Sequence, residues 1–180
     1  LGENVPVPAD DVDGLVELAR ARGVDLVVVG PDAALVAGLA DRLFDAGTPC
    51  VGPGAAAARL DGSKAFAKDF MQRHSIPSAA YQTFDQMDLA GAALKDNQFD
   101  FPVVLKADGL ASGKRVFVCA TLEESLEALN AIMGERRFGA SGEHLIIEEF
   151  LEGEEVSFMV FSDGVNILPM VPSQDHKAIY

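Results

Sequence analysis

The first third of the chain alternates amphipathic segments with short apolar runs. Apolar side chains recur at helical spacing over residues 11–22, and Gly23 follows, so the pattern predicts a helix that ends there. Residues 24–30 form a run that is apolar except for Asp25, typical of a strand buried on both faces of a parallel sheet. A second helix is expected over 31–47 and a second short strand over 48–53. This rhythm predicts a doubly wound α/β layer.

The pattern changes at Ser63, the expected N-cap of a helix that ends before Pro77. Thr121 and Glu124 form a capping-box pattern at the start of a later helix. The other elements expected here are strands at 79–84, 101–106 and 115–120, a helix at 86–97, and three successive strands between 144 and 173, the last two turning at Asp163-Gly164. This second part is α+β in character with antiparallel pairing.

An alanine-rich stretch at 54–58 separates the two patterns and is interpreted as a domain junction. The prediction is a partial doubly wound α/β domain over 1–58, followed by an α+β domain over 59–180 that contains a smaller subdomain at about 80–152. Neither end of the chain coincides with a clean helix or strand, so we expect a segment of a longer protein.

Composition narrows the classes of function. The 49% hydrophobic content excludes a disordered chain, and no apolar run is long enough for a membrane span. A net charge of -14 disfavours binding to a nucleic-acid backbone, although a few cations can still bind a small anion locally. Cys50 and Cys119 lie far apart among apolar or small residues, so we expect reduced thiols in a cytoplasmic protein. The isolated histidines do not suggest a zinc site.

The glycine-rich stretch after Lys106 is the main candidate for a phosphate site. A Walker loop is excluded because Asp108 replaces its first glycine and Arg115 replaces its hydroxyl residue. No G-x-G-x-x-G follows a predicted strand, which excludes the dinucleotide fingerprint of an oxidoreductase. The residues that remain form a loop between two strands, where Gly109 and Gly113 would let backbone N–H groups approach phosphate. From the loop alone, an ordinary hairpin with a solvated lysine is an equal alternative.

Three other polar features contain candidate site residues, and the first two have a simpler explanation when taken alone. Glu148 and Glu149 must point to opposite faces of a strand, so one of them faces the interior of a covered sheet. A solvated acidic surface is the alternative for this pair. Lys64 stands near a helix start, where the macrodipole disfavours a cation unless it is exposed or binds an anion. Residues 173–177 collect polar groups at a strand end, as the rim of a site does.

The order of these features resembles the ATP-grasp ligases, and among them the glycinamide ribonucleotide synthetase family. The matching segments are "VVVGPDAALVAG", "GSKAFAKDFM", "VVLKADGLASGKRV", "IIEEFLEGEEVSF" and "LPMVPSQDHK", which together span nearly the whole chain. One departure is Arg115, which stands where the family's glycine-rich lid usually ends in glycine.

The resemblance implies a role for individual residues. Lys64 and Lys106 look like the family's phosphate-contacting lysines, with Lys106 and Lys177 in the catalytic centre. The remaining implied nucleotide contacts are Asp108, Gly109, Ser112, Gly113 and Lys114 in the lid, and Glu148, Glu149, Leu151 and Glu155 around adenine and ribose. Asp175, His176 and Lys177 look like substrate-side residues.

The implied reaction joins glycine to 5-phosphoribosylamine. ATP first converts the glycine carboxylate to an acyl phosphate, which the amine then attacks, and catalysis consists mainly of positioning and charge neutralisation. The implied cofactors are ATP and Mg²⁺ or Mn²⁺, with the metal ligands expected outside these residues, and the fragment alone is expected to be inactive. The implied partners are small molecules, without nucleic acid or membrane. Another ATP-grasp carboxylate–amine ligase and a non-catalytic nucleotide-binding module remain alternatives.

Overall fold

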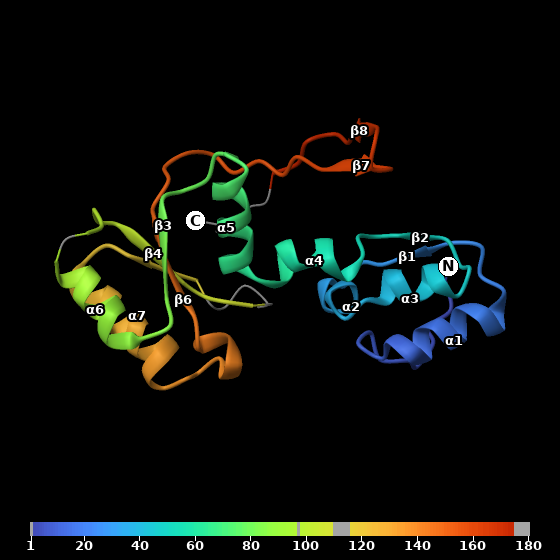
Figure 1. The fold of residues 1–180 in the computed structure, drawn as a ribbon, viewed down its shortest axis with the longest axis horizontal. Coiled ribbons are helices and arrows are strands. Elements are labelled where there is room, and N and C mark those ends of the chain that lie inside the picture. The colour runs from blue at the N-terminus through green and yellow to red at the C-terminus, as the bar shows by residue number, and fades with distance from the viewer. Residues whose placement is uncertain (1, 97, 110–115, 175–180) are drawn as a thin grey trace. The chain divides into compact units, whose positions relative to one another are not determined.

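The structure is a computed structural model that describes residues 2–96, 98–109 and 116–174. The chain divides into two compact units, Leu1–Phe150 and Leu151–Tyr180 (Figure 1). Within the described residues, no helix has the length and apolar character needed to cross a bilayer.

The N-terminal region of the first unit is the predicted α/β layer. Its elements are α1 (Val12–Arg22), β1 (Val27–Val28), α2 (Asp32–Val36), α3 (Leu39–Asp45) and β2 (Cys50–Val51). β1 and β2 pair in parallel, with Val27 opposite Cys50, as two strands joined by a helical crossover do. The helices pack on this pair through a small apolar core of Val16, Ala19, Ala34, Leu39 and Leu43.

Two details of this layer differ from the prediction. The single helix expected over 31–47 is wrong, because Gly38 has φ +89° between α2 and α3. A left-handed residue cannot continue a right-handed helix, and glycine adopts that conformation at low cost. The expected seven-residue strand is also shorter, since only Val27 and Val28 have ladder partners among the described residues.

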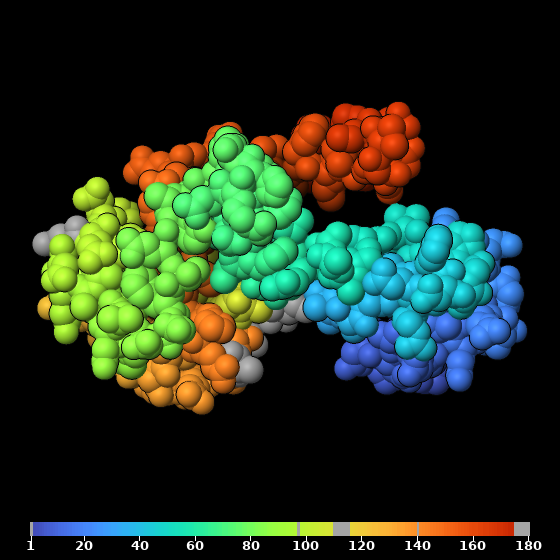
Figure 2. All heavy atoms as spheres, viewed as in Figure 1, coloured from blue at the N-terminus to red at the C-terminus, as the bar shows by residue number. Residues whose placement is uncertain are grey.

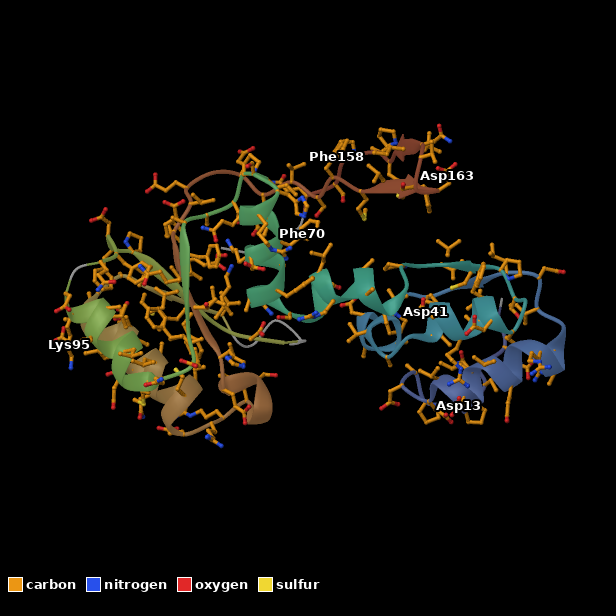
Figure 3. The ribbon with its side chains drawn as sticks, in the orientation of Figure 1. Asp13, Asp41, Phe70, Lys95, Phe158 and Asp163 are labelled. Carbon is orange, nitrogen blue, oxygen red and sulfur yellow. The ribbon has the colours of Figure 1, made fainter. Side chains whose placement is uncertain are left out.

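The alanine-rich stretch is the start of helix α4 (Ala55–Gly62), in line with the strong helix propensity of alanine. Asp41 on α3 accepts the N–H of Ala55 at 2.7 Å and so satisfies one donor at the start of α4 (Figure 3). Ser63 then separates α4 from α5 (Lys64–Arg73), and its Oγ accepts from Phe66 N as the predicted N-cap. The domain boundary at residue 58 stays a prediction.

The rest of the first unit is a four-stranded antiparallel sheet with helices on both faces. The strands are β3 (Tyr81–Phe84), β4 (Val103–Ala107), β5 (Val116–Cys119) and β6 (Leu145–Glu149), in the order β3-β6-β4-β5. The remaining helical elements are α6 (Met87–Lys95), α7 (Leu122–Leu129), a π-helical turn (Asn130–Gly134) and a 3-10 turn (Gly139–Gly142). Thr121 caps α7 as predicted, accepting from Glu124 N, while Glu124 accepts from the N–H of Ala120.

Strand alternation separates the two faces of this sheet. Val103, Leu105 and Ile147 point into the core formed with α6 and α7, and each is fully buried. The strand residues that alternate with these three, including Lys106 and Glu148, therefore face the other side. Helix α5 covers that side, so a charged face of the sheet meets a helix rather than solvent (Figure 1).

The second unit is a small hairpin of β7 (Val160–Ser162) and β8 (Ile167–Pro169). It turns at Asp163-Gly164 as predicted, and Ser157 bridges Ser173 beyond its strands. Asp163 Oδ1 accepts the N–H groups of Val165 and Asn166, which fixes the turn. Large apolar side chains of this unit are exposed, Phe158 among them (Figure 3), and Figure 2 draws the atoms of the unit at the orange-to-red end of its colour range.

Candidate functional site

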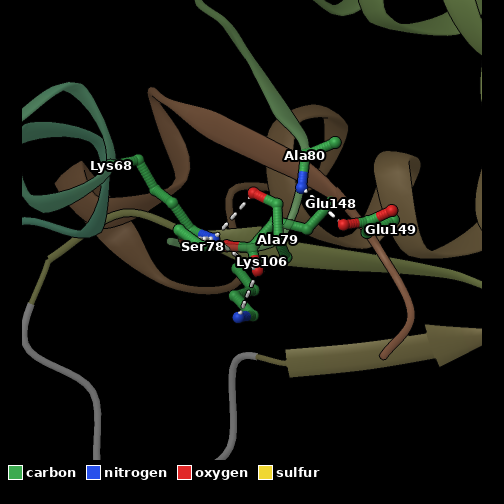
Figure 4. A network of polar contacts seen from close by, with 7 residues as sticks. All are labelled: Lys68, Ser78, Ala79, Ala80, Lys106, Glu148 and Glu149. Carbon is green, nitrogen blue, oxygen red and sulfur yellow. Dashed lines mark hydrogen bonds and ion pairs between the residues drawn. The ribbon is translucent and has the colours of Figure 1, made fainter. Parts of the chain in front are cut away.

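Glu148 is the centre of a buried charged cluster on the α5 side of the sheet. Its side chain is 5% exposed, and its Oε2 lies 2.8 Å from Lys106 Nζ on β4 and 3.2 Å from Lys68 Nζ on α5. Val104 is opposite Glu148 in the β4–β6 register, so Lys106 is a diagonal neighbour on the same face. Figure 4 shows both ammonium groups at this one carboxylate. Two cations share one anion, which leaves one positive charge in excess.

The cluster also has unused hydrogen-bonding capacity. Lys106 is 25% exposed, and within the described part of the chain its Nζ contacts Glu148 alone. An ammonium group has three N–H donors, so two of them remain for a ligand. Glu148 Oε1 is buried and lacks a hydrogen-bond partner among the described residues. Because a buried carboxylate oxygen without a donor is costly, this atom indicates a donor that a ligand or water supplies.

The glycine-rich loop begins against the N-terminus of α5. Asp108 Oδ1 accepts from Ala65 N at 3.2 Å, and its Oδ2 accepts from Ser63 Oγ at 2.9 Å. Lys64 Nζ donates to the carbonyl oxygen of Gly109 at 2.9 Å. The carboxylate at the helix start offsets the unfavourable position of the lysine. Lys106 precedes Asp108 by two positions in the chain, and Lys64 bonds to Gly109. Both lysines therefore lie at the start of the glycine-rich loop.

Glu149 points away from the cluster, as strand alternation predicts. Its Oε1 accepts from Ala80 N at 2.8 Å and its own N–H donates to Ala80 O at 3.0 Å (Figure 4). These two bonds hold the end of β6 to the segment that precedes β3. The side chain of Glu149 thus has a structural partner, while that of Glu148 faces the candidate site.

Asp61, close to Lys64, has a pKa above the ordinary value of an aspartate. Burial raises the pKa of its carboxyl group, and the charge and hydrogen bond of Asp32 raise this pKa further. Lys64 acts in the opposite direction and lowers it. Two carboxyl groups near each other favour retention of a proton by one of them.

The remaining predicted site residues belong to the second unit or lie outside the described residues. Leu151 and Glu155 belong to the second unit and are exposed. Ser112, Gly113, Lys114, Asp175, His176 and Lys177 lie outside the described residues. Their roles stay predictions. Among the residues described, no group of three or more His, Cys, Asp or Glu side chains is arranged to hold a metal ion.

Lys68 is the member of the cluster that sequence reasoning missed. It follows Lys64 by one helical turn and therefore lies on the same face of α5, which is the signal that could have identified it. Its side chain is 10% exposed and pairs with Glu148. A lysine in an amphipathic helix is usually solvated, so the sequence pattern alone favoured the surface.

Two family models cover the chain. The N domain of phosphoribosylglycinamide synthetase matches residues 1–61, and the ATP-grasp (A) domain of the same enzyme matches residues 62–180. Phosphoribosylamine–glycine ligase of Allochromatium vinosum is 52% identical over 98% of this chain, and that of Escherichia coli O157:H7 is 48% identical over 98%. In both cases the match covers 41% of the relative, so the chain spans about two fifths of their length.

Solved structures give the same result. Phosphoribosylamine–glycine ligase of Thermotoga maritima matches 95% of this chain and 40% of its own, with a TM-score of 0.76 and 30% identity. The biotin carboxylase domain of a Hydrogenobacter thermophilus 2-oxoglutarate carboxylase, solved with MgADP, has a TM-score of 0.74. It covers 94% of this chain and 39% of its own at 21% identity, which shows a shared fold. The chain belongs to the phosphoribosylglycinamide synthetase family and combines a partial doubly wound α/β layer with part of an α+β ATP-grasp domain.

Proposed function

We propose that this chain forms the nucleotide-binding part of a cytoplasmic phosphoribosylamine–glycine ligase. The enzyme would use ATP to join glycine to 5-phosphoribosylamine, giving glycinamide ribonucleotide, ADP and phosphate. The relatives at about half identity support this reaction. The observation that carries the proposal is the pair of Lys106 and Glu148: among the described residues, two N–H donors of Lys106 and one buried oxygen of Glu148 have no partner.

An adenine nucleotide fits the hydrogen-bonding capacity of this pair. Its phosphate oxygens are acceptors for Lys106, and its exocyclic amino group is a donor for Glu148 Oε1. A positive charge in a partly desolvated site attracts phosphate more strongly than the same charge in water. Lys64 would supply a second cation, exchanging its contact with Gly109 for a phosphate oxygen.

The chemistry assigns these residues a role in charge neutralisation. A carboxylate is a poor electrophile, and transfer of a phosphoryl group converts it to a mixed anhydride that an amine can attack. Lys106 and Lys64 would hold the phosphates in position and offset their charge during this transfer. Mg²⁺ would neutralise further phosphate charge, with ligands that we expect in parts of the full-length protein outside this chain. Asp175, His176 and Lys177 would line the substrate side.

The test is ADP formation by the full-length gene product. The proposal predicts ADP release that requires both glycine and 5-phosphoribosylamine, with glycinamide ribonucleotide as the product detected by mass spectrometry. Release of ADP with a different carboxylate and amine would replace the proposal with another ATP-grasp ligase. Nucleotide binding without any turnover would instead indicate a non-catalytic module.

A further inference from the structure

Lys68 is a buried cation whose donors are all used inside the protein. Its Nζ lies 2.7 Å from Ser78 Oγ, 3.3 Å from Ala79 O and 3.2 Å from Glu148 Oε2. These three acceptors match the three N–H groups of an ammonium. The segment that leads into β3 supplies two of them, and β6 supplies the third (Figure 4). Lys68 therefore has no donor left for a bound nucleotide.

Lys106 shares Glu148 Oε2 with Lys68 but is more exposed, at 25% against 10% of the side chain. Without the charge of Lys68, Glu148 and Lys106 would form a neutral pair. A neutral pair attracts an anion weakly, because the potential of the carboxylate cancels that of the ammonium at the distance of a ligand. With Lys68 present, one positive charge remains, and Lys106 is the cation of this pair whose donors are not all used by the described residues.

We infer that Lys68 is a positioning residue for phosphate binding, an inference that rests on the proposed function. It compensates the charge of Glu148, so Lys106 keeps its own charge for phosphate. It also fixes the Glu148 side chain by engaging Oε2, which leaves Oε1 as the oxygen available to a ligand. Lys68 acts entirely through Glu148 and Lys106 and does not contact the nucleotide.

The test compares two probes, ADP and adenosine, by calorimetry on the full-length protein. Adenosine lacks phosphate, so the ratio of its Kd to that of ADP isolates the phosphate contribution. Lys68→Met removes the excess charge and is expected to lower this ratio by about tenfold or more, the scale of one charge-assisted hydrogen bond. Lys68→Arg keeps the charge, and the ratio is expected to stay within about threefold of wild type, a change of under 1 kcal/mol.

Glu148 provides the complementary variants. Glu148→Gln leaves two uncompensated cations, so the ratio is expected to rise. The Lys68→Met/Glu148→Gln double variant restores one excess charge, and the ratio should return toward wild type. Any contact with the base that the Glu148→Gln substitution removes affects both probes and cancels in the ratio. A purely structural role for Lys68 would instead weaken ADP and adenosine together and would not be rescued by the second substitution.

Loss of a buried cation can also prevent folding, so circular dichroism and thermal melting accompany each variant. If Lys68→Met does not fold, Glu148→Gln and the double variant carry the test, and equal ratios in these two variants overturn the inference. Normal ADP binding by wild type with an unchanged ratio in Lys68→Met also overturns the inference but leaves the proposed function standing. Failure of the wild-type protein to bind ADP overturns both.

Discussion

Replacement of Lys106 by methionine should weaken nucleotide binding without unfolding the protein. Methionine keeps most of the aliphatic side chain but removes the ammonium that we place against phosphate. A charge-assisted hydrogen bond contributes about 1.5–3 kcal/mol, which corresponds to roughly a tenfold to hundredfold increase in the Kd for ADP. Glu148 keeps Lys68 as a partner at 3.2 Å, so no buried charge is left unpaired and the fold should persist.

Titration calorimetry with ADP on the full-length protein measures this effect, and Lys95→Met provides the matched control. Lys95 is exposed at the end of α6 (Figure 3). Its substitution by methionine changes the net charge by the same amount at a position away from the cluster. Salt screens such a distant charge, so the control should bind ADP within about twofold of wild type. A Kd for Lys106→Met that matches the control would refute the phosphate role of Lys106.

Three further predictions concern the fold. Ile147→Ala should lower the free energy of unfolding by about 2–5 kcal/mol because this side chain is fully buried. The control Val165→Ala, at a position with 89% exposure, should change it by less than about 0.5 kcal/mol. Equal losses for the two variants in chemical denaturation would contradict the assigned core. Asp108→Ala should lower the free energy of unfolding by about 0.5–2 kcal/mol because it removes two hydrogen bonds at the start of α5. Asp108→Asn should lose less, because the amide oxygen can still accept one of them. Backbone and side-chain donation from Asn166, followed by the N–H of Val165, lowers the pKa of Asp163 to about 2. The resulting support of the turn is therefore complete above the ordinary value of 3.8 and is lost as pH falls through about 2. An NMR titration of the Asn166 amide with its midpoint near 3.8 would disprove that turn geometry.

The sequence predicted helix starts and turns correctly where a side chain bonds to nearby backbone groups. The caps at Ser63 and Thr121 and the turn at Asp163 involve side chains that bond to backbone within a few residues. The break at Gly38 was missed because apolar residues continue on both sides of it, so the helical period gave no warning. Only the backbone conformation of Gly38 shows that one expected helix is two.

The candidate site was predictable where it depends on strand alternation. Adjacent glutamates on a covered strand must face opposite sides, so one of Glu148 and Glu149 was expected to face inward, and the structure shows that it is Glu148. Helical spacing could place Lys68 on the same face as Lys64, but the burial of Lys68 could not be predicted. Its acceptors come from Ser78, Ala79 and Glu148, which lie 10, 11 and 80 positions along the chain and meet it only in the folded protein. The burial of a cation depends on such tertiary partners, which periodicity does not encode.

The central claim is that the Lys106–Glu148 pair binds an adenine nucleotide. A crystal structure of the full-length protein with ADP tests it most directly. The account predicts a phosphate oxygen within hydrogen-bond distance of Lys106 Nζ and a nucleotide N–H donor at Glu148 Oε1, with Lys68 still bonded to Ser78 and Glu148. ADP bound elsewhere, with Glu148 Oε1 remaining without a donor, would contradict it.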